Sequence, residues 1–169
     1  MRWNKKFVYP KSIRSTDNGI RRYLIGEKKL PSVTSILDAT KSEEDKAALA
    51  NWVERTGLKE SEAIVKAASN RGSKMHAYLE SFLLGQENLS FFDDNEQYKI
   101  MAKQIIEKGL INRFEEVWGV ECTLYKPDSY SGTCDAVGVY DGRESIIDFK
   151  QSNKPKKFEY IDSWLLQTA

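Results

Sequence analysis

The fold of this chain is decided by residues 133–150, which read TCDAVGVYDGRESIIDFK. Two runs rich in β-branched and aromatic residues flank Asp141-Gly142, the preferred centre of a two-residue type I′ turn. This pattern predicts a β-hairpin, and its register places Asp135 directly opposite Asp148 on one face of the sheet. Lys150 shares that face, because side chains alternate along a strand.

Two carboxylates directly opposite each other destabilise a hairpin unless something offsets their repulsion. A divalent cation would do so, and hard oxygen ligands suit Mg²⁺ or Mn²⁺. Asp135, Asp148, a metal ion and Lys150 together could activate a water molecule and stabilise a pentavalent phosphate. The alternative is an exposed sheet face on which Lys150 only pairs with Asp148, and the two strands alone leave both interpretations open.

The hairpin belongs to a longer pattern of helices followed by strands. Short apolar runs at 116–125, 132–140 and 143–150, separated by turn residues, predict an antiparallel three-strand meander. Helical periodicity and capping residues precede the meander, and a further helix begins near the end of the chain. The expected helices cover residues 32–39, 42–56, 60–84, 93–108 and 158–169. Together these elements make a mixed α/β domain.

The first 30 residues differ in charge from the rest of the chain. They hold nine basic and two acidic side chains, whereas the whole chain has a net charge of only +1. Short apolar runs at 7–9 and 20–25, with Asp17-Asn18-Gly19 before the second run, predict a hairpin in this basic arm. A basic end on an acidic body favours contact with a polyanion at one face, with a solvated arm as the equal alternative.

Length and composition bound the remaining possibilities. The chain has 169 residues, of which 40% are hydrophobic and 30% charged, so we expect a single domain over residues 1–169. Its parts are a basic arm at 1–30, a helical part at 32–108, and a sheet with the start of a helix at 115–169. No apolar run reaches the ~20 residues that would span a bilayer, and no secretory signal is visible. Two cysteines are too few for a disulfide framework, so we expect an intracellular protein that does not act at a membrane.

His76 is the only histidine, and it lies on the long predicted helix. Gly72, His76 and Glu80 are spaced four residues apart and share one helical face. A histidine and a glutamate at this spacing could both reach one metal ion or its water shell. The alternative is a surface pair worth a few tenths of a kcal/mol. Gly72 favours the metal interpretation, because glycine inside a helix costs ~1 kcal/mol relative to alanine and needs a reason to be there.

The ordered combination of these motifs resembles the PD-(D/E)XK nuclease superfamily. The matching segments are Gly72-x-x-x-His76-x-x-x-Glu80, Gly132-Thr133-Cys134-Asp135 and Asp148-Phe149-Lys150. Residues 30–37 (LPSVTSIL) and 50–55 (ANWVER) are similar to further motifs of the RecB-like exonuclease branch. Within that branch, the chain looks nearest to the group of mitochondrial genome maintenance exonucleases and their phage relatives. The resemblance implies a restriction-endonuclease-like α/β core.

The resemblance also implies roles for the matching residues. Asp135 and Asp148 correspond to metal-binding catalytic aspartates, and the Phe149 carbonyl corresponds to a backbone metal ligand. His76 corresponds to the histidine that ligates the metal in the RecB-like branch. Lys150 corresponds to the catalytic lysine that orients or polarises the attacking water.

Three further side chains enter the comparison with this superfamily. Glu80 corresponds to a catalytic contact made through water near the metal. Glu121 lies on the first strand, where some relatives carry another acidic residue, but we interpret it as an exposed strand carboxylate. Gln167 matches the glutamine of a catalytic Gln-x-x-x-Tyr motif whose tyrosine would follow the last residue. We therefore expect a chain truncated at its C-terminus; a partner that supplies the missing helix, or a weakened site, are the alternatives.

Residues that contact DNA are expected in two places. The segment 150–157 holds four lysines and no acidic residue, which suits a phosphate backbone, although a solvated loop is the alternative. The DNA-binding residues expected there are Ser152, Lys154, Lys156 and Lys157. The second place is a predicted helix N-terminus, which is itself an anion site and offers Ser32, Thr34 and Ser35.

We therefore expect a Mg²⁺- or Mn²⁺-dependent deoxyribonuclease that removes nucleotides from single-stranded or frayed DNA ends in replication, recombination or repair. The expected setting is the cytoplasm of a bacterium or of a phage-infected cell. One alternative is a non-catalytic DNA-binding or recombination-accessory subunit built on a nuclease fold. Another is a structure-specific endonuclease, which would cut a closed circle that offers no end. The expected partner is DNA, in a homo-oligomer or a larger nuclease complex.

Overall fold

The centre of the computed structural model, which describes residues 1–86, 96–153, 156–158 and 161–169, is a four-stranded sheet. Its strand order is β1-β5-β6-β7, with antiparallel β5, β6 and β7 and a parallel β1 beside β5. A second sheet has the order β2-β3-β4. The strands are β1 (Arg2–Trp3), β2 (Ile13–Asp17), β3 (Ile20–Ile25), β4 (Lys28–Pro31), β5 (Phe114–Lys126), β6 (Tyr130–Tyr140) and β7 (Arg143–Ile147).

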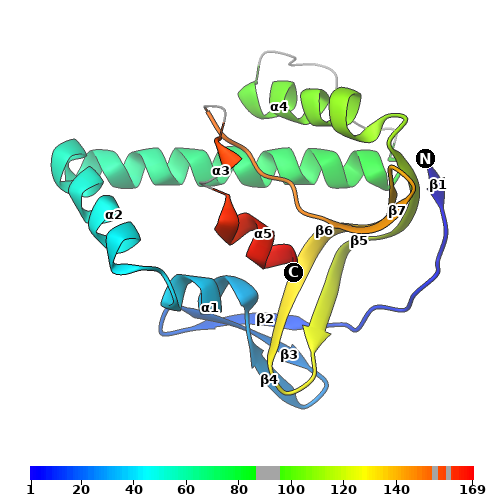
Figure 1. Ribbon diagram of the computed structural model, residues 1–169, viewed down its shortest axis with the longest axis horizontal. Helices are drawn as coiled ribbons and strands as arrows, with labels where there is room; N and C mark the ends of the chain where they lie inside the picture. Colours follow the sequence, from blue (N-terminus) through cyan, green and yellow to red (C-terminus); the bar gives the residue numbers. More distant parts are fainter. Residues whose placement is uncertain (87–95, 154–155, 159–160) are drawn as a thin grey trace.

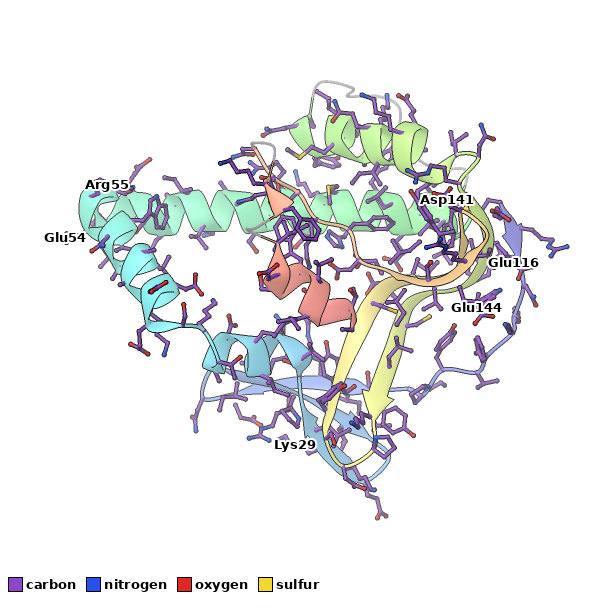
Figure 2. The ribbon with its side chains drawn as sticks, in the orientation of Figure 1. Lys29, Glu54, Arg55, Glu116, Asp141 and Glu144 are labelled. Atoms are coloured by element: carbon purple, nitrogen blue, oxygen red, sulfur yellow. The ribbon has the colours of Figure 1, made fainter. Side chains whose placement is uncertain are left out.

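The helices lie beside and around the four-stranded sheet (Figure 1). The long helix α3 crosses the molecule, and α4 packs along it. Helix α2 and the start of α3 extend away from the sheet, so that Glu54 and Arg55 mark the far end of α2 (Figure 2). The helical elements are α1 (Val33–Ala39), α2 (Glu43–Thr56), α3 (Leu58–Leu83), α4 (Gln97–Ile105), a π-helical turn η1 (Ile106–Leu110) and α5 (Asp162–Thr168).

The α/β class and the antiparallel meander are confirmed, and the basic arm differs from its prediction. Residues 7–9 form no strand; Phe7 instead makes edge-on ring contacts with both Tyr9 and Trp118. The partner of β3 is instead β2, and Asn18-Gly19 joins the two strands with positive φ at both positions, as a type I′ turn requires. A third strand, β4, which the sequence did not predict, completes this sheet.

The register predicted from Asp141-Gly142 is confirmed as far as the ladder runs. Both turn residues have positive φ, and the strand pairs continue from Tyr140–Arg143 to Ala136–Ile147. The predicted strand was too long at its end, since β7 stops at Ile147 rather than residue 150. Asp135 and Asp148 therefore lie one step beyond the last ladder pair instead of forming a pair of their own.

The predicted helix ends are confirmed within a few residues. The Ser42 hydroxyl accepts a hydrogen bond from the Asp45 amide and caps α2, and the buried Ser32 does the same for α1 through Ser35. The helix expected at 60–84 is α3, which begins two residues earlier. The start of the helix expected at 93–108 lies outside the described residues. None of the helices within the described ranges combines the length and apolar character that a bilayer span requires.

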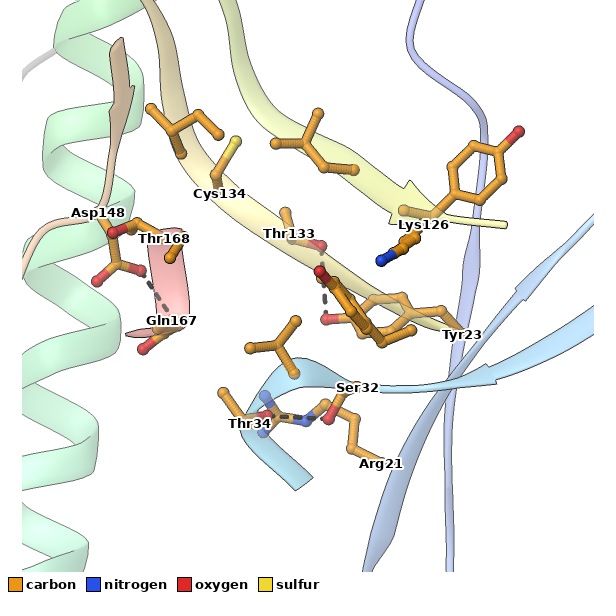
Figure 3. A pocket seen from close by; sticks show the side chains of 17 residues that line it. Arg21, Tyr23, Ser32, Thr34, Lys126, Thr133, Cys134, Asp148, Gln167 and Thr168 are labelled. Carbon is orange, nitrogen blue, oxygen red and sulfur yellow. Dashed lines mark hydrogen bonds between the residues drawn. The ribbon is translucent and has the colours of Figure 1, made fainter. Parts of the chain in front are cut away.

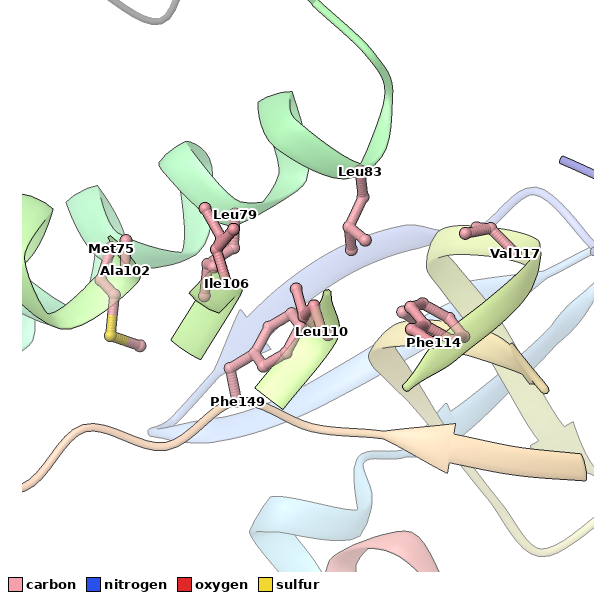
Figure 4. Packing of buried hydrophobic residues seen from close by; sticks show 10 residues of the cluster. Met75, Leu79, Leu83, Ala102, Ile106, Leu110, Phe114, Val117 and Phe149 are labelled. Atoms are coloured by element: carbon pink, nitrogen blue, oxygen red, sulfur yellow. The ribbon is translucent and has the colours of Figure 1, made fainter. Parts of the chain in front are cut away.

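The hydrophobic core joins α3 to the four-stranded sheet (Figure 4). Met75, Leu79 and Leu83, which recur at helical spacing, are all buried. They pack in one cluster with Ala102, Ile106, Leu110, Phe114, Val117, Ala136 and Phe149. Phe149 anchors the segment after β7 in this core, so its two neighbours in the sequence can face the cleft on the other side.

Candidate active site

A cleft of about 1,030 Å³ lies where the second sheet faces α3, β5 and β6. Side chains from several separate elements reach it, and many of them can ligate a cation, hold a proton or contact phosphate. The ones singled out from the sequence are His76 of α3, Glu121 of β5, Asp135 of β6, Asp148 and Lys150 beyond β7, Gln167 of α5 and Thr34 of α1. Lys11, Arg14 and Arg21 of the basic arm line another part of the wall.

His76, Glu121 and Asp135 form a group that could hold a metal ion. Each offers one ligand atom, and these atoms lie within 4.8 Å of one another. His76 Nδ1 lies 3.0 Å from Asp135 Oδ1, so the helix and the sheet meet at this point. The two side chains are 32% and 13% exposed, which leaves the group open to the cleft on one side.

Glu121 enters this group through the register of β5 against β6. Val120 pairs with Ala136 and Cys122 pairs with Cys134, so Glu121 lies opposite Asp135. Its backbone has a φ of 50°, in the left-handed region that non-glycine residues seldom adopt within a strand. This conformation is costly for an L-residue, by about 1–2 kcal/mol. Glu121 is an exposed carboxylate on β5, as expected from the sequence, and it also lies within reach of the His76–Asp135 pair.

Asp135 also holds the segment that follows β7. Its Oδ2 accepts a hydrogen bond from the Phe149 amide. The ladder ends where it does because this amide bonds to a side chain and not to the backbone of β6. One carboxylate therefore contacts the histidine on α3 and fixes the residue between Asp148 and Lys150.

Asp148, Lys150 and Gln167 form a second polar cluster in the same cleft. The Lys150 ammonium pairs with Asp148 Oδ2 and donates to Gln167 Oε1 at 2.9 Å. Gln167 Nε2 donates to Asp148 Oδ1 at 3.1 Å (Figure 3). The Asp148 side chain is only 10% exposed, so its carboxylate has lost most of its contact with water. The Lys150 ammonium and the Gln167 amide take the place of that water.

Burial and neighbouring charge raise three pKa values in the cleft. Burial is the main cause for Glu121, and the charges of Asp135 and Glu80 add to it. Burial also raises the pKa of Asp148, against the opposing effect of Lys150. For His76, the hydrogen bond with Asp135 raises the pKa. All three groups therefore hold protons more tightly than usual.

The donor set fits a divalent cation. Two carboxylates and one imidazole offer hard oxygen and nitrogen atoms, and Asp148 supplies a third carboxylate beside them. A cation would offset both the burial of the Glu121 carboxylate and the repulsion from Asp135 and Glu80, which together raise its pKa, and it would replace the protons on the three groups. The structure thus brings together His76 and Asp135 of the expected metal ligands, whereas Asp148 is held by Lys150 and Gln167, and Phe149 contributes its amide to Asp135.

The remaining expected site residues are more scattered. Glu80 is half-buried one turn after His76, near enough to raise the pKa of Glu121, but it is outside the group of three. Ser32 is buried, and its hydroxyl lies 2.9 Å from the hydroxyls of both Thr34 and Ser35. Ser35 also bonds to the backbone of Arg21 and so ties α1 to β3.

Among the described residues of the basic segment after Lys150, Ser152, Lys156 and Lys157 do not line the cleft. Ser152 lines a different cavity, between α3 and α4. Lys156 and Lys157 are exposed at the surface. Lys154 lies outside the described residues. Their expected contact with DNA stays a prediction.

Arg71 holds the segment beyond Lys150 in position, a role that the sequence did not reveal. Its Nε donates to Gln151 Oε1 at 2.7 Å and its Nη2 donates to Asn153 Oδ1 at 2.9 Å. Gln151 Nε2 in turn donates to the Ala68 carbonyl at 2.8 Å. A methyl group at Gly72, next in the chain, would meet the Gln151 side chain only at ordinary van der Waals distance, so this contact does not require a glycine. These contacts fasten the segment beyond Lys150 to α3.

Known proteins support the resemblance deduced from the motifs. The chain is 30% identical over 137 residues to mitochondrial genome maintenance exonuclease 1 of Homo sapiens, and 32% identical over 132 residues to the protein of that name from Mus musculus. These proteins are partial homologues of the chain. The alignments include 76% and 75% of the chain, but the chain spans only 38% of the length of either relative. No protein-family model matches the chain.

The name shared by both relatives describes an exonuclease of genome maintenance. It agrees with the group to which the ordered motifs point. The alignments cover about three quarters of the chain, and the cleft draws its residues from almost the whole chain, from the basic arm to α5.

Proposed function

We propose that the chain is the nuclease part of a metal-dependent DNA exonuclease of the PD-(D/E)XK type. The observation that carries this proposal is the meeting of two clusters in one cleft: His76, Glu121 and Asp135 as cation ligands, and Lys150 held by Asp148 and Gln167. The name of the two relatives supports an exonuclease, and therefore DNA as the substrate. Single-stranded or frayed ends, met in replication, recombination or repair, are the proposed targets.

The proposed ion is Mg²⁺ or Mn²⁺, bound by His76, Glu121 and Asp135 with Asp148 beside them. Such an ion would lower the pKa of a water molecule and neutralise charge on the phosphate. Hydrolysis then forms a bond from the water oxygen to phosphorus and breaks the bond from phosphorus to the leaving sugar oxygen. One proton leaves the water, and one ends on the leaving oxygen.

Lys150 supplies a fixed positive charge for this reaction. Its ammonium carries three protons, and Asp148 and Gln167 engage two of them. The third can point toward a water molecule or a phosphate oxygen in the cleft. Because both partners are themselves joined, the ammonium need not reorganise as charge develops on the phosphate.

The basic arm supplies the proposed contacts to the DNA backbone. Lys11, Arg14 and Arg21 line the cleft that contains the two clusters. Positive side chains that line such a cleft attract phosphates, and their contribution falls as salt is added. Their position in the cleft supports a polyanion contact over a solvated segment, the equal alternative for this arm.

The test is the cleavage of end-labelled linear DNA, single- and double-stranded, in Mg²⁺, in Mn²⁺ and in EDTA. We expect metal-dependent shortening from an end by the parent chain, and its loss in Lys150→Ala. Lys46→Ala is the matched control, because Lys46 makes only a surface ion pair with Glu43 on α2. A closed single-stranded circle should stay intact.

Each of the other outcomes contradicts a stated part of the proposal. Cleavage of the circle would indicate an endonuclease. Salt-dependent DNA binding without cleavage in either metal would favour a non-catalytic accessory subunit. Equal cleavage by the parent and by Lys150→Ala would remove Lys150 from the reaction and overturn the assignment.

A further inference from the structure

A smaller cavity lies beside the cleft. Its volume is about 260 Å³, and it lies between α1, the far ends of β5 and β6, and the end of α5 (Figure 3). Six residues line both spaces, so the two are adjacent. These shared residues are Arg21, Tyr23, Thr34, Thr133, Asp148 and Gln167. The junction therefore carries a cation, Arg21, and two members of the Lys150 cluster.

The wall of the smaller cavity is mainly apolar and aromatic. Val33, Leu124 and Ile146 provide aliphatic surface. Tyr23, Tyr125 and Tyr130 provide aromatic rings. Such rings offer faces on which a flat heterocycle can stack.

Hydroxyl groups are numerous in this wall, beside the charged or amide side chains of Arg21, Lys126, Asp148 and Gln167. The Tyr23 hydroxyl lies 3.5 Å from the Thr133 hydroxyl, and Ser32 and Thr34 bond to each other. A hydroxyl can both donate and accept a hydrogen bond. The wall can therefore meet the polar edge of different heterocycles without selecting one of them.

We propose that this cavity receives one unpaired nucleobase of a DNA strand whose phosphate lies in the adjoining cleft. The location of that phosphate rests on the proposed function. Three observations favour a base as the occupant: aromatic rings in the wall, a cation at the junction, and a position beside the cleft that holds the candidate cation ligands. A nucleotide has the matching pattern of a flat, partly polar ring joined to an anion.

The size of the cavity determines the state of the base. At about 260 Å³ it lies below the range of roughly 300–1,000 Å³ that pockets for drug-sized ligands occupy. One base fits into such a space, whereas a base pair joined to its neighbours does not. A base must leave its partner to enter, so the cavity selects unpaired nucleotides beside the cleaved bond and tolerates any base type.

The test is a binding measurement in EDTA, which needs no cleavage. Fluorescence anisotropy compares three probes of equal length: a single-stranded oligothymidylate, the same sugar-phosphate strand without bases, and a duplex. The proteins are the parent chain, Val33→Phe, which fills the cavity, and Tyr125→Ala, which removes a ring that is 45% exposed. Ile36→Phe is the matched control. Ile36 lies on α1 together with Val33 and is 37% exposed, but it is not among the described residues that line the cavity.

We expect the parent chain to bind the oligothymidylate about tenfold more tightly than the abasic strand, which is the usual size of one stacked base. Val33→Phe should abolish this preference, Tyr125→Ala should reduce it, and Ile36→Phe should keep it. Duplex binding should be the same in all four proteins. Since Tyr125 is largely at the surface, its substitution keeps the test valid even where Val33→Phe fails to fold.

Equal binding of the oligothymidylate and the abasic strand by the parent would overturn the proposal, as would a preference that survives in both cavity variants. The nuclease proposal fails separately. Metal-dependent cleavage without a base preference would overturn the base cavity alone. A base preference that depends on Val33, with no cleavage in either metal, would overturn the nuclease alone.

Discussion

Lys150 and Gln167 are joined by a hydrogen bond of 2.9 Å from Nζ to Oε1, across 17 residues of sequence. Asp148 closes a ring with both, because it pairs with the Lys150 ammonium through one oxygen and accepts from Gln167 Nε2 through the other. Each member has its position fixed by the other two. Helix α5 therefore contributes to the cleft through one side chain that orients the lysine.

Replacing Gln167 by alanine should lower the rate of DNA cleavage about 10- to 100-fold. The substitution leaves the lysine charge in place but removes one of its two supports, and small misplacements of a reacting group cost rates of this size. Any change in DNA affinity in EDTA should be smaller than this loss of rate. Single-turnover cleavage separates the two effects.

Ser163→Ala is the control for this substitution. Ser163 is exposed on the same helix, so its loss should alter neither the rate nor the affinity. A Gln167→Ala chain that cleaves at the parent rate would show that Asp148 alone positions the lysine.

How much of this site can be deduced from the sequence depends on what fixes the residue pairing within each pair of strands. Asp141-Gly142 sets the pairing of β6 with β7 locally, so the neighbourhood of Asp135 and Asp148 follows from counting residues. Glu121 lies across the other strand pair, where the register holds without a shift from Lys126–Tyr130 to Gly119–Val137 and shifts only farther from the turn. Its place opposite Asp135 therefore depends on the turn at 127–129, and Pro127-Asp128-Ser129 does not fix the pairing as Asp141-Gly142 does.

Contacts between residues distant in the sequence were also beyond prediction. Arg71 bonds to Gln151, which is 80 positions away in the sequence. No local sequence pattern indicates that an arginine and a glutamine so far apart will meet. Strand β1 is only two residues long and pairs with β5 in parallel, so no alternation of side chains reveals it. Periodicity was sufficient for α3, whose buried Met75, Leu79 and Leu83 form a regular apolar stripe.

Replacing Glu121 by glutamine should weaken Mn²⁺ binding at least tenfold, because the amide removes one charged ligand atom from the group formed with His76 and Asp135. Isothermal titration calorimetry on the DNA-free chain measures this affinity. Glu115→Gln is the matched control on the same strand. The Glu115 Oε1 atom accepts a hydrogen bond from the Gly142 amide, and an amide oxygen can accept it as well.

A second variant separates metal binding from backbone strain at Glu121. Glycine adopts a φ of 50° without the penalty of an L-residue, so Glu121→Gly should leave the metal-free chain as stable as the parent, or more stable by up to about 1 kcal/mol. Its Mn²⁺ affinity should fall like that of Glu121→Gln. Urea unfolding in EDTA measures the stability. A clear loss of stability would show that the Glu121 side chain supports the fold itself.

The stabilisation of the chain by Mg²⁺ or Mn²⁺ should grow with pH. Burial raises the pKa of Glu121 and of Asp148, and the hydrogen bond with Asp135 raises the pKa of His76. The folded metal-free chain thus binds more protons than the unfolded chain, so its stability falls as pH rises. For His76 the contribution is complete below the ordinary value of 6.5 and disappears as pH passes through the raised value.

A metal ion needs the same three groups without their protons, so its affinity increases over the range in which they are released. The gain in Tm between EDTA and Mg²⁺ or Mn²⁺ should therefore be small at about pH 5 and larger at about pH 8. His76→Gln should remove the part of this rise that lies above pH 6.5. A gain in Tm that is constant with pH would mean that the ion binds away from these groups.

Gly138→Ala should destabilise the chain by about 3 kcal/mol, near the upper end of the usual cost of overpacking. A methyl group at this position would collide with the Glu116 carbonyl oxygen and with the Phe114 ring, and a neighbouring backbone cannot move aside as a flexible side chain can. Gly132→Ala on the same strand is the control, since its methyl group would only reach Val33 Cγ2 at 3.7 Å. Urea unfolding in EDTA compares the two variants.

The same pair of variants tests whether the close approach of β5 and β6 builds the cation ligands. Glu121 and Asp135 come from these two strands, and both lie close to Gly138 along the ladder. A Gly138→Ala chain that remains folded should therefore bind Mn²⁺ more weakly, because a widened ladder separates the two carboxylates. Unchanged Mn²⁺ affinity in a folded Gly138→Ala chain would instead show that the contact between His76 and Asp135 is sufficient to set the site.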